Sequence, residues 1–139
     1  IPANGLVFDS QGTVLYVADT ARGAIWKVAV NPDGKAGKPS LMAQSTLLEG
    51  AHGPAFDPKG NLWVAANERN AIVEVTPHGK VRDVFKNDSK GPLEFPTAVI
   101  FVGNTAYVSN FDTARRDNLA ADGKTSLDGI GASIIQITP

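Results

Sequence analysis

The chain has 139 residues, 42% of them hydrophobic, and its 13 basic and 14 acidic side chains give a formal net charge of −1. This length is sufficient for one globular domain with its own core. The charges form no basic block, so neither nucleic acid nor an anionic membrane is expected as a partner. No apolar run approaches the roughly 20 residues of a membrane span.

The sequence contains no cysteine, which excludes a disulfide framework, an iron–sulfur cluster and a thiolate zinc site. This absence does not fix the compartment. The triplet Asn87, Asp88, Ser89 matches the N-glycosylation pattern, and localisation stays open, with a lean toward a secreted or periplasmic protein. Because the chain starts with Ile1 instead of Met, we expect a processed chain or a fragment.

The first part of the chain predicts four short strands. An apolar stretch at residues 6–8 is followed by further strand patterns at residues 14–19, 24–28 and 40–43. Between the first two strands, residues 9–12 run from an Asp to a Gly. This segment predicts a turn, because an Asp side chain accepts backbone hydrogen bonds and Gly permits a positive φ.

The same module returns twice, at a spacing of about 45 residues. The second copy has strand patterns at residues 54–56, 61–65, 71–75 and 80–85, and the third at 99–101, 106–110 and 133–137. Repeats of this length built from short strands are typical of a β-propeller with one four-stranded blade per unit. The sequence therefore predicts an all-β fold, a partial β-propeller of about three blades over residues 1–139. The units are predicted at 1–47, 48–92 and 93–139.

Three blades form an open arc, whereas propellers close with four to eight. We expect the arc to need the remainder of a propeller to cover its apolar ends. Those blades would come from the same polypeptide, which is the expectation we prefer, or from other copies of the chain.

Polar residues recur where the predicted strands begin and end on one face of the propeller, around the central channel. The strand starts carry Asn4, His52 and Thr97, and the strand ends carry Asp19, Asn67 and Asn110. Such a set of oxygen and nitrogen atoms suits a hard cation or a polar ligand. Taken singly, each residue is better explained as a strand cap that satisfies loop backbone. As a convergent set, the six residues favour the functional interpretation.

Residues 111–132 form a long connection on the same face, where the other units have only about four residues. An insertion of this length inside a compact domain is usually a functional lid or a solvated loop, and both remain possible. Six charged residues in or beside it could reach over the channel mouth: Arg115, Arg116, Asp117, Asp122, Lys124 and Asp128.

Several of these motifs resemble the regucalcin–gluconolactonase family of six-bladed propellers. They are the Asn-Gly-Leu at residues 4–6, the segment at 15–20, Gly-Asn-Leu-Trp-Val-Ala at 60–65 and Phe-Pro-Thr at 95–97. The resemblance covers nearly the whole chain apart from the insertion and would match the second half of the family's propeller. The motif at residues 60–65 also occurs in NHL-repeat propellers, which are often binding scaffolds.

The resemblance implies a divalent cation, commonly calcium, held at the channel mouth by a Glu, an Asn and an Asp. Asn4 matches the family's Asn. His52 stands where the family has its acidic ligand, and the Glu would lie outside this chain. Calcium prefers oxygen ligands, so His52 favours Zn²⁺ or Mn²⁺, or a role as a general base.

The resemblance thus predicts a metal-dependent lactonase or esterase-like hydrolase acting on a small lactone or ester. Asn4 and His52 are the predicted metal ligands, His52 the predicted catalytic residue, and Asp19, Asn67, Thr97 and Asn110 the predicted supporting or ligand-binding residues. The alternative is a non-catalytic, NHL-like propeller that binds a ligand or a protein on the same face.

Overall fold

The structure is a computed structural model that describes residues 3–115, 118–127 and 131–138. The strands are β1 (Ala3–Phe8), β2 (Val14–Asp19), β3 (Ala24–Ala29), β4 (Ser40–Gln44), β5 (Ala51–Phe56), β6 (Leu62–Ala66), β7 (Ala71–Val75), β8 (Val81–Lys86), β9 (Pro96–Val102), β10 (Thr105–Asn110) and β11 (Ser133–Ile137). Two short 3₁₀ turns, η1 (Thr46–Leu48) and η2 (Asn67–Arg69), lie between strands. In the part of the chain so described, no helix is long and apolar enough to cross a membrane.

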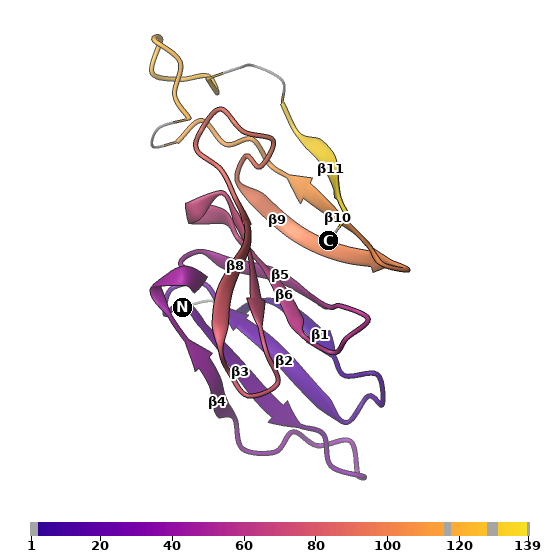
Figure 1. The fold of residues 1–139 in the computed structure, drawn as a ribbon. Helices are drawn as coiled ribbons and strands as arrows, with labels where there is room; N and C mark the ends of the chain where they lie inside the picture. Colours follow the sequence, from indigo (N-terminus) through magenta and orange to yellow (C-terminus); the bar gives the residue numbers. More distant parts are fainter. Residues whose placement is uncertain (1–2, 116–117, 128–130, 139) are drawn as a thin grey trace.

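The strands form three antiparallel sheets, each in the order of the chain (Figure 1). Sheet 1 has the order β1-β2-β3-β4, sheet 2 the order β5-β6-β7-β8, and sheet 3 the order β9-β10-β11. The first strands β1, β5 and β9 contact one another in that order. Consecutive strands that pair side by side, in sheets arranged around their first strands, confirm the predicted all-β propeller architecture.

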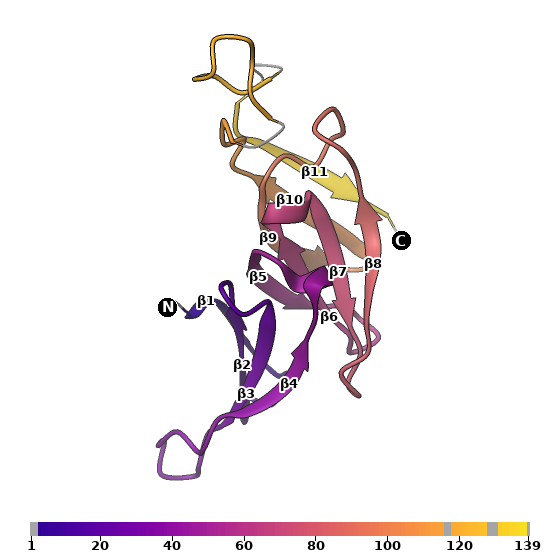
Figure 2. The ribbon, with the colours of Figure 1, turned by 90° about the vertical axis from the view of Figure 1, so that its left-hand side faces the viewer.

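The sheets stack through two apolar cores, one at each junction between neighbouring sheets (Figure 2). The first core combines residues of sheets 1 and 2, among them Ile25 and Val64, and the second combines sheets 2 and 3, among them Ile72 and Val108. Because strand residues alternate between the two faces of a sheet, sheet 2 contributes one face to each core. This explains why every residue of β6 and β7 is buried.

The predicted Asp turns hold the first and second strands of sheets 1 and 2 together. The Asp9 carboxylate accepts hydrogen bonds from the backbone N–H of Thr13 at 2.7 Å and from its hydroxyl at 2.9 Å. The Asp57 carboxylate accepts from the N–H groups of Lys59 and Asn61, both at 2.8 Å. These carboxylates stabilise their turns at the end of the sheets remote from the strand starts.

Candidate functional site

Each first strand contains a β-bulge near its start, where it has one residue more than the strand beside it. In β1 the residues Asn4 and Gly5 share one partner position on β2, and in β5 His52 and Gly53 share one on β6. In β9 the extra residue is Thr97. A bulge bends its strand and redirects a side chain. The structure therefore places the three predicted strand-start residues at equivalent points of neighbouring strands.

Two glycines allow these bulges to lie directly against one another. A Cβ added to Gly5 would come within 2.6 Å of the Gly53 Cα, and one added to Gly53 would come within 2.6 Å of the Thr97 carbonyl oxygen and 2.7 Å of the Ala98 Cα. These separations are too short for any side chain. Glycine is thus required at both positions for the first strands to approach this closely, and the bulges form a continuous row.

The Asn4 side chain is held by a hydrogen-bond relay to the neighbouring sheet. Its amide nitrogen donates to the Thr20 hydroxyl oxygen at 3.2 Å, and the Thr20 hydroxyl donates to the Ala51 carbonyl at 2.7 Å. Ala51 directly precedes His52 in β5. Thr20 therefore ties the orientation of the Asn4 amide to the backbone that carries His52.

The other two bulge residues are partly buried. His52 is half-buried, and so is Thr97, whose hydroxyl lies 2.9 Å from that of Ser109. The Thr97 hydroxyl also donates to the Ser109 carbonyl at 3.3 Å. Thr97 is thus already engaged with β10, so the bulge residues best placed to offer atoms to a ligand are Asn4 and His52.

Asp19 ends β2, but its carboxylate is bound within its own loop. It accepts hydrogen bonds from the Arg22 backbone N–H at 3.2 Å, from the Arg22 guanidinium at 2.8 Å and from the Trp26 indole at 3.3 Å. Burial raises the pKa of Asp19, and the bonds from Arg22 and Trp26 lower that pKa by more, so the net shift is downward. Asp19 remains ionised and organises the connection from β2 to β3.

Asn110 ends β10 and binds two separate segments with its amide. The amide oxygen accepts from the Glu94 N–H at 3.2 Å, and the amide nitrogen donates to the Pro92 carbonyl at 2.7 Å and the Ser133 hydroxyl at 3.1 Å. Such bonds satisfy loop backbone inside the fold. The structure places Asn110 at the predicted strand end, with its polar atoms used for structure.

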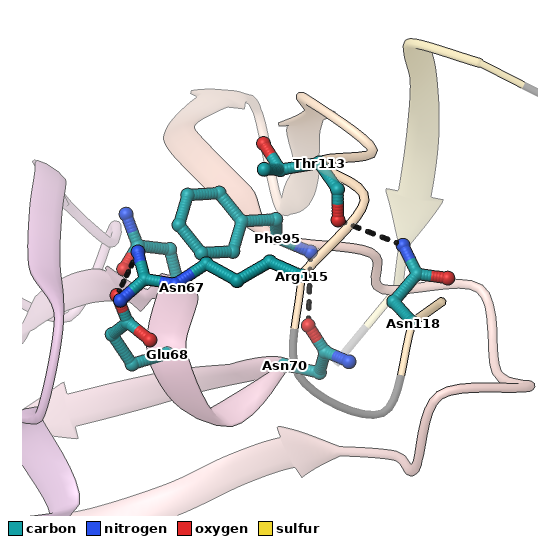
Figure 3. A pocket seen from close by; sticks show the side chains of 7 residues that line it. All are labelled: Asn67, Glu68, Asn70, Phe95, Thr113, Arg115 and Asn118. Carbon is teal, nitrogen blue, oxygen red and sulfur yellow. Dashed lines mark hydrogen bonds and ion pairs between the residues drawn. The ribbon is translucent and has the colours of Figure 1, made fainter. Parts of the chain in front are cut away.

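Asn67 lies under the first part of the 111–132 insertion and is only 5% exposed. With Thr113, Arg115 and Asn118 it lines a cavity of about 20 Å³ (Figure 3), room for one water molecule. The Asn67 amide oxygen and the Thr113 hydroxyl have no hydrogen-bond partner among the described residues. Both atoms are therefore available to a bound water.

Arg115 connects the insertion to sheet 2 across this cavity. Its guanidinium lies 2.7 Å from a carboxylate oxygen of Glu68 in η2 and 5.7 Å from the centre of the Phe95 ring (Figure 3). This contact brings the insertion over the loops of the neighbouring sheet on the predicted face. The predicted residues Arg116, Asp117 and Asp128 lie outside the described residues.

The insertion is organised internally around Asp112. The Asp112 carboxylate accepts hydrogen bonds from the Ser126 hydroxyl at 2.7 Å, the Gly131 N–H at 2.9 Å and the Asn118 amide at 3.0 Å. Asn118 in turn accepts from the Leu127 N–H at 3.2 Å. Burial raises the pKa of Asp112, but these hydrogen bonds lower it by more.

Sequence reasoning did not identify Thr20, Asp112 or the pair of Arg115 with Glu68. Thr20 directly follows Asp19 in a segment quoted for the family resemblance, yet its partners Asn4 and Ala51 are 16 and 31 residues away. Nothing local in the sequence marks such a contact. Among residues 3–115, 118–127 and 131–138, no cluster of three or more His, Cys, Asp or Glu side chains is arranged to bind a metal.

Comparison with known proteins identifies relatives of this fold. The SMP-30/Gluconolactonase/LRE-like region matches residues 1–111. A 6-deoxy-6-sulfogluconolactonase from Pseudomonas putida is 28% identical over 125 residues, which make up 86% of this chain and 40% of that protein.

Two solved structures share the architecture at low sequence identity. A luciferin-regenerating enzyme superimposes with a TM-score of 0.70 and 18% identity, over 99% of this chain and 45% of the other. A regucalcin from Agrobacterium tumefaciens, described as a calcium-binding protein, superimposes with a TM-score of 0.67 and 19% identity, over 97% and 46%. This chain therefore spans less than half the length of each of these relatives.

The family match covers most of the chain and includes the bulges of β1, β5 and β9. It confirms the resemblance inferred from the Asn-Gly-Leu and Gly-Asn-Leu-Trp-Val-Ala motifs, and the two superpositions confirm the fold. The chain belongs to the SMP-30/gluconolactonase/LRE-like family.

Proposed function

We propose that this chain forms part of a divalent-cation-dependent hydrolase that opens a small lactone or ester at the mouth of the propeller channel. The observation that carries the proposal is the row of bulges, which sets Asn4 and the half-buried His52 on adjoining first strands. Family membership and the sulfogluconolactonase relative support a lactone as the substrate class.

The two side chains offer different atoms to a cation. The Asn4 amide nitrogen is engaged by Thr20, which leaves the amide oxygen to act as a ligand, and His52 offers an imidazole nitrogen. Both groups are uncharged when they bind a metal. Oxygen ligands suit Ca²⁺, the ion named for the regucalcin relative, whereas imidazole suits Zn²⁺ or Mn²⁺. We propose Ca²⁺ as the ion, with Zn²⁺ and Mn²⁺ as the alternatives that His52 favours.

The chemistry of such a site is ester hydrolysis. When bound, a divalent cation polarises a carbonyl group and lowers the pKa of bound water. As base, His52 would accept a proton from the water whose oxygen adds to the carbonyl carbon. It would return that proton to the ring oxygen as the carbon–oxygen bond breaks, so that lactone and water become a hydroxy acid. As a metal ligand, His52 would instead hold the cation together with Asn4.

The proposal is tested by thermal melting with Ca²⁺, Mn²⁺ and Zn²⁺ and by hydrolysis of gluconolactone. We expect at least one cation to raise the melting temperature, and His52→Ala to abolish this gain or to lower hydrolysis by about 100-fold or more. The matched control is His78→Ala, because His78 is the other histidine and lies in an exposed turn. Melting that no cation changes would contradict the proposal.

His52→Asp separates the two roles. This variant restores a carboxylate at the position where the family has one, so as a ligand it should favour Ca²⁺ over Zn²⁺. If His52 serves only as base, the cation preference of His52→Asp should equal that of the unchanged chain, while the pH dependence of hydrolysis shifts toward acid.

Ligand binding without catalysis is the second candidate function. It is favoured by the Arg115–Glu68 contact, which brings the insertion over the same face, and by the lack of a carboxylate at the positions of Asn4 and His52. Deletion of residues 111–132 should then remove ligand binding from a chain that hydrolyses no lactone. Retained binding after the deletion would contradict this candidate.

A further inference from the structure

Backbone strain in this chain gathers around the cavity beside Arg115. In the described part of the chain, the non-glycine residues with a positive φ are Asn70 (47°), Phe95 (53°) and Asp112 (53°). Asn70 and Phe95 line the cavity, and Asp112 directly precedes Thr113, which lines it too. Residues other than glycine rarely adopt this conformation, and where they do the strain often accompanies a functional site.

Hydrogen bonds between the loops hold this strained backbone in place. The Asn70 amide oxygen accepts from the Phe95 N–H at 2.9 Å, and the Phe95 carbonyl accepts from the Phe111 N–H at 3.2 Å. The Asp112 N–H donates to the Glu94 carbonyl at 3.1 Å. The loops of sheets 2 and 3 thus fix the backbone that carries the Phe95 ring, directly before β9 and its bulge.

The sequence Asp-Thr-Ala-Arg occurs twice, at residues 19–22 and 112–115, and its two copies use their arginines differently. In sheet 1 the Arg22 guanidinium pairs with the Asp of its own copy at 2.8 Å. In the insertion the Asp accepts hydrogen bonds from later residues of the loop, and Arg115 pairs instead with Glu68 of sheet 2. Arg115 is therefore directed out of its own loop and toward the neighbouring sheet.

The Arg115 guanidinium is oriented by two contacts and remains open to solvent. It lies 2.7 Å from the Glu68 carboxylate and 5.7 Å from the centre of the Phe95 ring (Figure 3), and its side chain is 51% exposed. A guanidinium carries several N–H donors in a planar fork, so the exposed part keeps donors for a further partner. Because the group is already oriented, little conformational freedom is lost when that partner binds.

The exposed edge of Arg115 suits an anion. Paired N–H donors of a guanidinium match the two oxygens of a carboxylate. The adjoining cavity is not the anion site, because its volume of about 20 Å³ admits one water and the Asn67 oxygen that lines it is itself an acceptor. The edge lies on the side of the strand starts, since η2, which carries Glu68, contacts β5, the strand of His52.

We propose that Arg115 binds an anionic oxygen group, such as a carboxylate, on the substrate whose carbonyl lies at the Asn4 and His52 bulges. The inference rests on the proposed hydrolase function and narrows its substrate to lactones that carry a negative charge. Glu68 neutralises the charge of Arg115, so the anion is held by the oriented N–H fork more than by net charge. The site should therefore distinguish Arg from Lys.

The test is binding to the full chain of glucuronate and of glucose, which differ in a terminal carboxylate and contain no lactone. We expect glucuronate to shift the nuclear magnetic resonance signals of the Arg115 Nε–H and the Phe95 amide, and to bind about 10-fold more tightly than glucose. Arg115→Gln should remove this preference, and Arg115→Lys should keep only part of it. Arg22→Gln, in the other copy of the motif, is the matched control and should leave the preference unchanged.

Three results would overturn the proposal. Equal binding of glucuronate and glucose would exclude an anion site. An equal loss of preference in Arg22→Gln and Arg115→Gln would indicate the general charge of the face. Acetate that binds as tightly as glucuronate would indicate an adventitious ion only.

Hydrolysis of gluconolactone and of its carboxylate form, glucarolactone, separates this inference from the proposed function. We expect Arg115→Gln to slow hydrolysis of glucarolactone about 10-fold or more and that of gluconolactone far less. If the chain hydrolyses gluconolactone but shows no preference for glucuronate, only the present inference fails. If Arg115 binds glucuronate but the chain hydrolyses neither lactone, the hydrolase proposal fails and the anion site stands.

Discussion

At the scale of single residues, the site depends on how one hydroxyl orients one amide. Thr20 accepts from the Asn4 amide nitrogen and donates to the Ala51 carbonyl. With its nitrogen so engaged, the Asn4 amide presents its oxygen as the free acceptor. Hydrogen bonds that orient a ligand usually contribute substantially to the affinity of a metal site.

We therefore expect Thr20→Val to weaken Mn²⁺ binding by about 10-fold or more. The same change should lower the free energy of unfolding without metal by only about 1–2 kcal/mol, since one exposed and one partly buried hydrogen bond are lost. Thr20→Ser, which keeps the hydroxyl, should restore most of the affinity. Calorimetric titration with Mn²⁺ measures the binding, and equal affinities for the two variants would exclude this positioning role.

The residue scale also shows where sequence reasoning reaches its limit. Asn4 and His52 were identified because each lies four residues before the aligned Phe of its repeat. The structure shows that the Gly after each of them is required by the contact between bulges. Asp19 and Asn110 were placed at the correct strand ends. The hydrogen-bond partners of these two side chains could not be predicted. Ser133, for example, lies 23 residues from Asn110 and contacts it only in the folded chain.

At the scale of elements, the bulges explain where the first strands begin. The apolar patterns predicted starts at residues 6, 54 and 99, whereas β1, β5 and β9 begin three residues earlier, at Ala3, Ala51 and Pro96. The extra residues contain the bulge, whose polar and glycine positions interrupt the apolar pattern. The other strands were predicted to within about two residues, because turn residues and alternation define them directly.

A methyl group at Gly53 should disrupt the row of bulges. Gly53→Ala would place a Cβ 2.6 Å from the Thr97 carbonyl, and relief of such overpacking costs about 1–3 kcal/mol. Gly37→Ala is the control, because its Cβ would come no closer than 3.2 Å to another atom, and its stability should change by less than about 1 kcal/mol. Urea unfolding measures both, and equal midpoints would contradict the close approach.

The insertion should lose its order when Asp112 is protonated. Its folded pKa lies below the ordinary value of 3.8, so the stabilisation from the ionised carboxylate is present above about pH 4 and is lost as pH falls through the folded pKa. We expect amide hydrogen exchange within residues 113–131 to accelerate as the pH falls below the folded pKa of Asp112. Asp112→Asn should produce the same loosening at pH 7, seen as faster tryptic cleavage after Arg115 and Lys124.

The control for this prediction is Asp33→Asn, which changes an exposed turn carboxylate far from the insertion. Its pKa is also lowered, by hydrogen bonds from Lys35, but it forms no hydrogen bond or ion pair with the described residues of the insertion. Cleavage after Arg115 that is as slow in Asp112→Asn as in Asp33→Asn would contradict the proposed organisation.

At the scale of the whole molecule, the repeat places the bulge residues at one end of the sheets and the Asp turns at the other. The starts of β1, β5 and β9 gather Asn4, His52 and Thr97, whereas Asp9 and Asp57 close the turns at the opposite end. The sequence predicted this division because strand direction follows from the repeat itself. The number of blades in the complete propeller, and the way in which its ring closes, could not be derived from three units alone.

The most direct test of the cation site is paramagnetic broadening of amide signals by substoichiometric Mn²⁺, followed by nuclear magnetic resonance. A cation at the channel mouth should broaden the signals of Gly5 and Gly53 first and leave those of Gly12 and Gly60, at the remote turns, sharp. His52→Ala or Asn4→Ala should weaken this pattern. Broadening that begins at the Asp9 and Asp57 turns instead, or that is uniform along the chain, would contradict a cation site at the row of bulges.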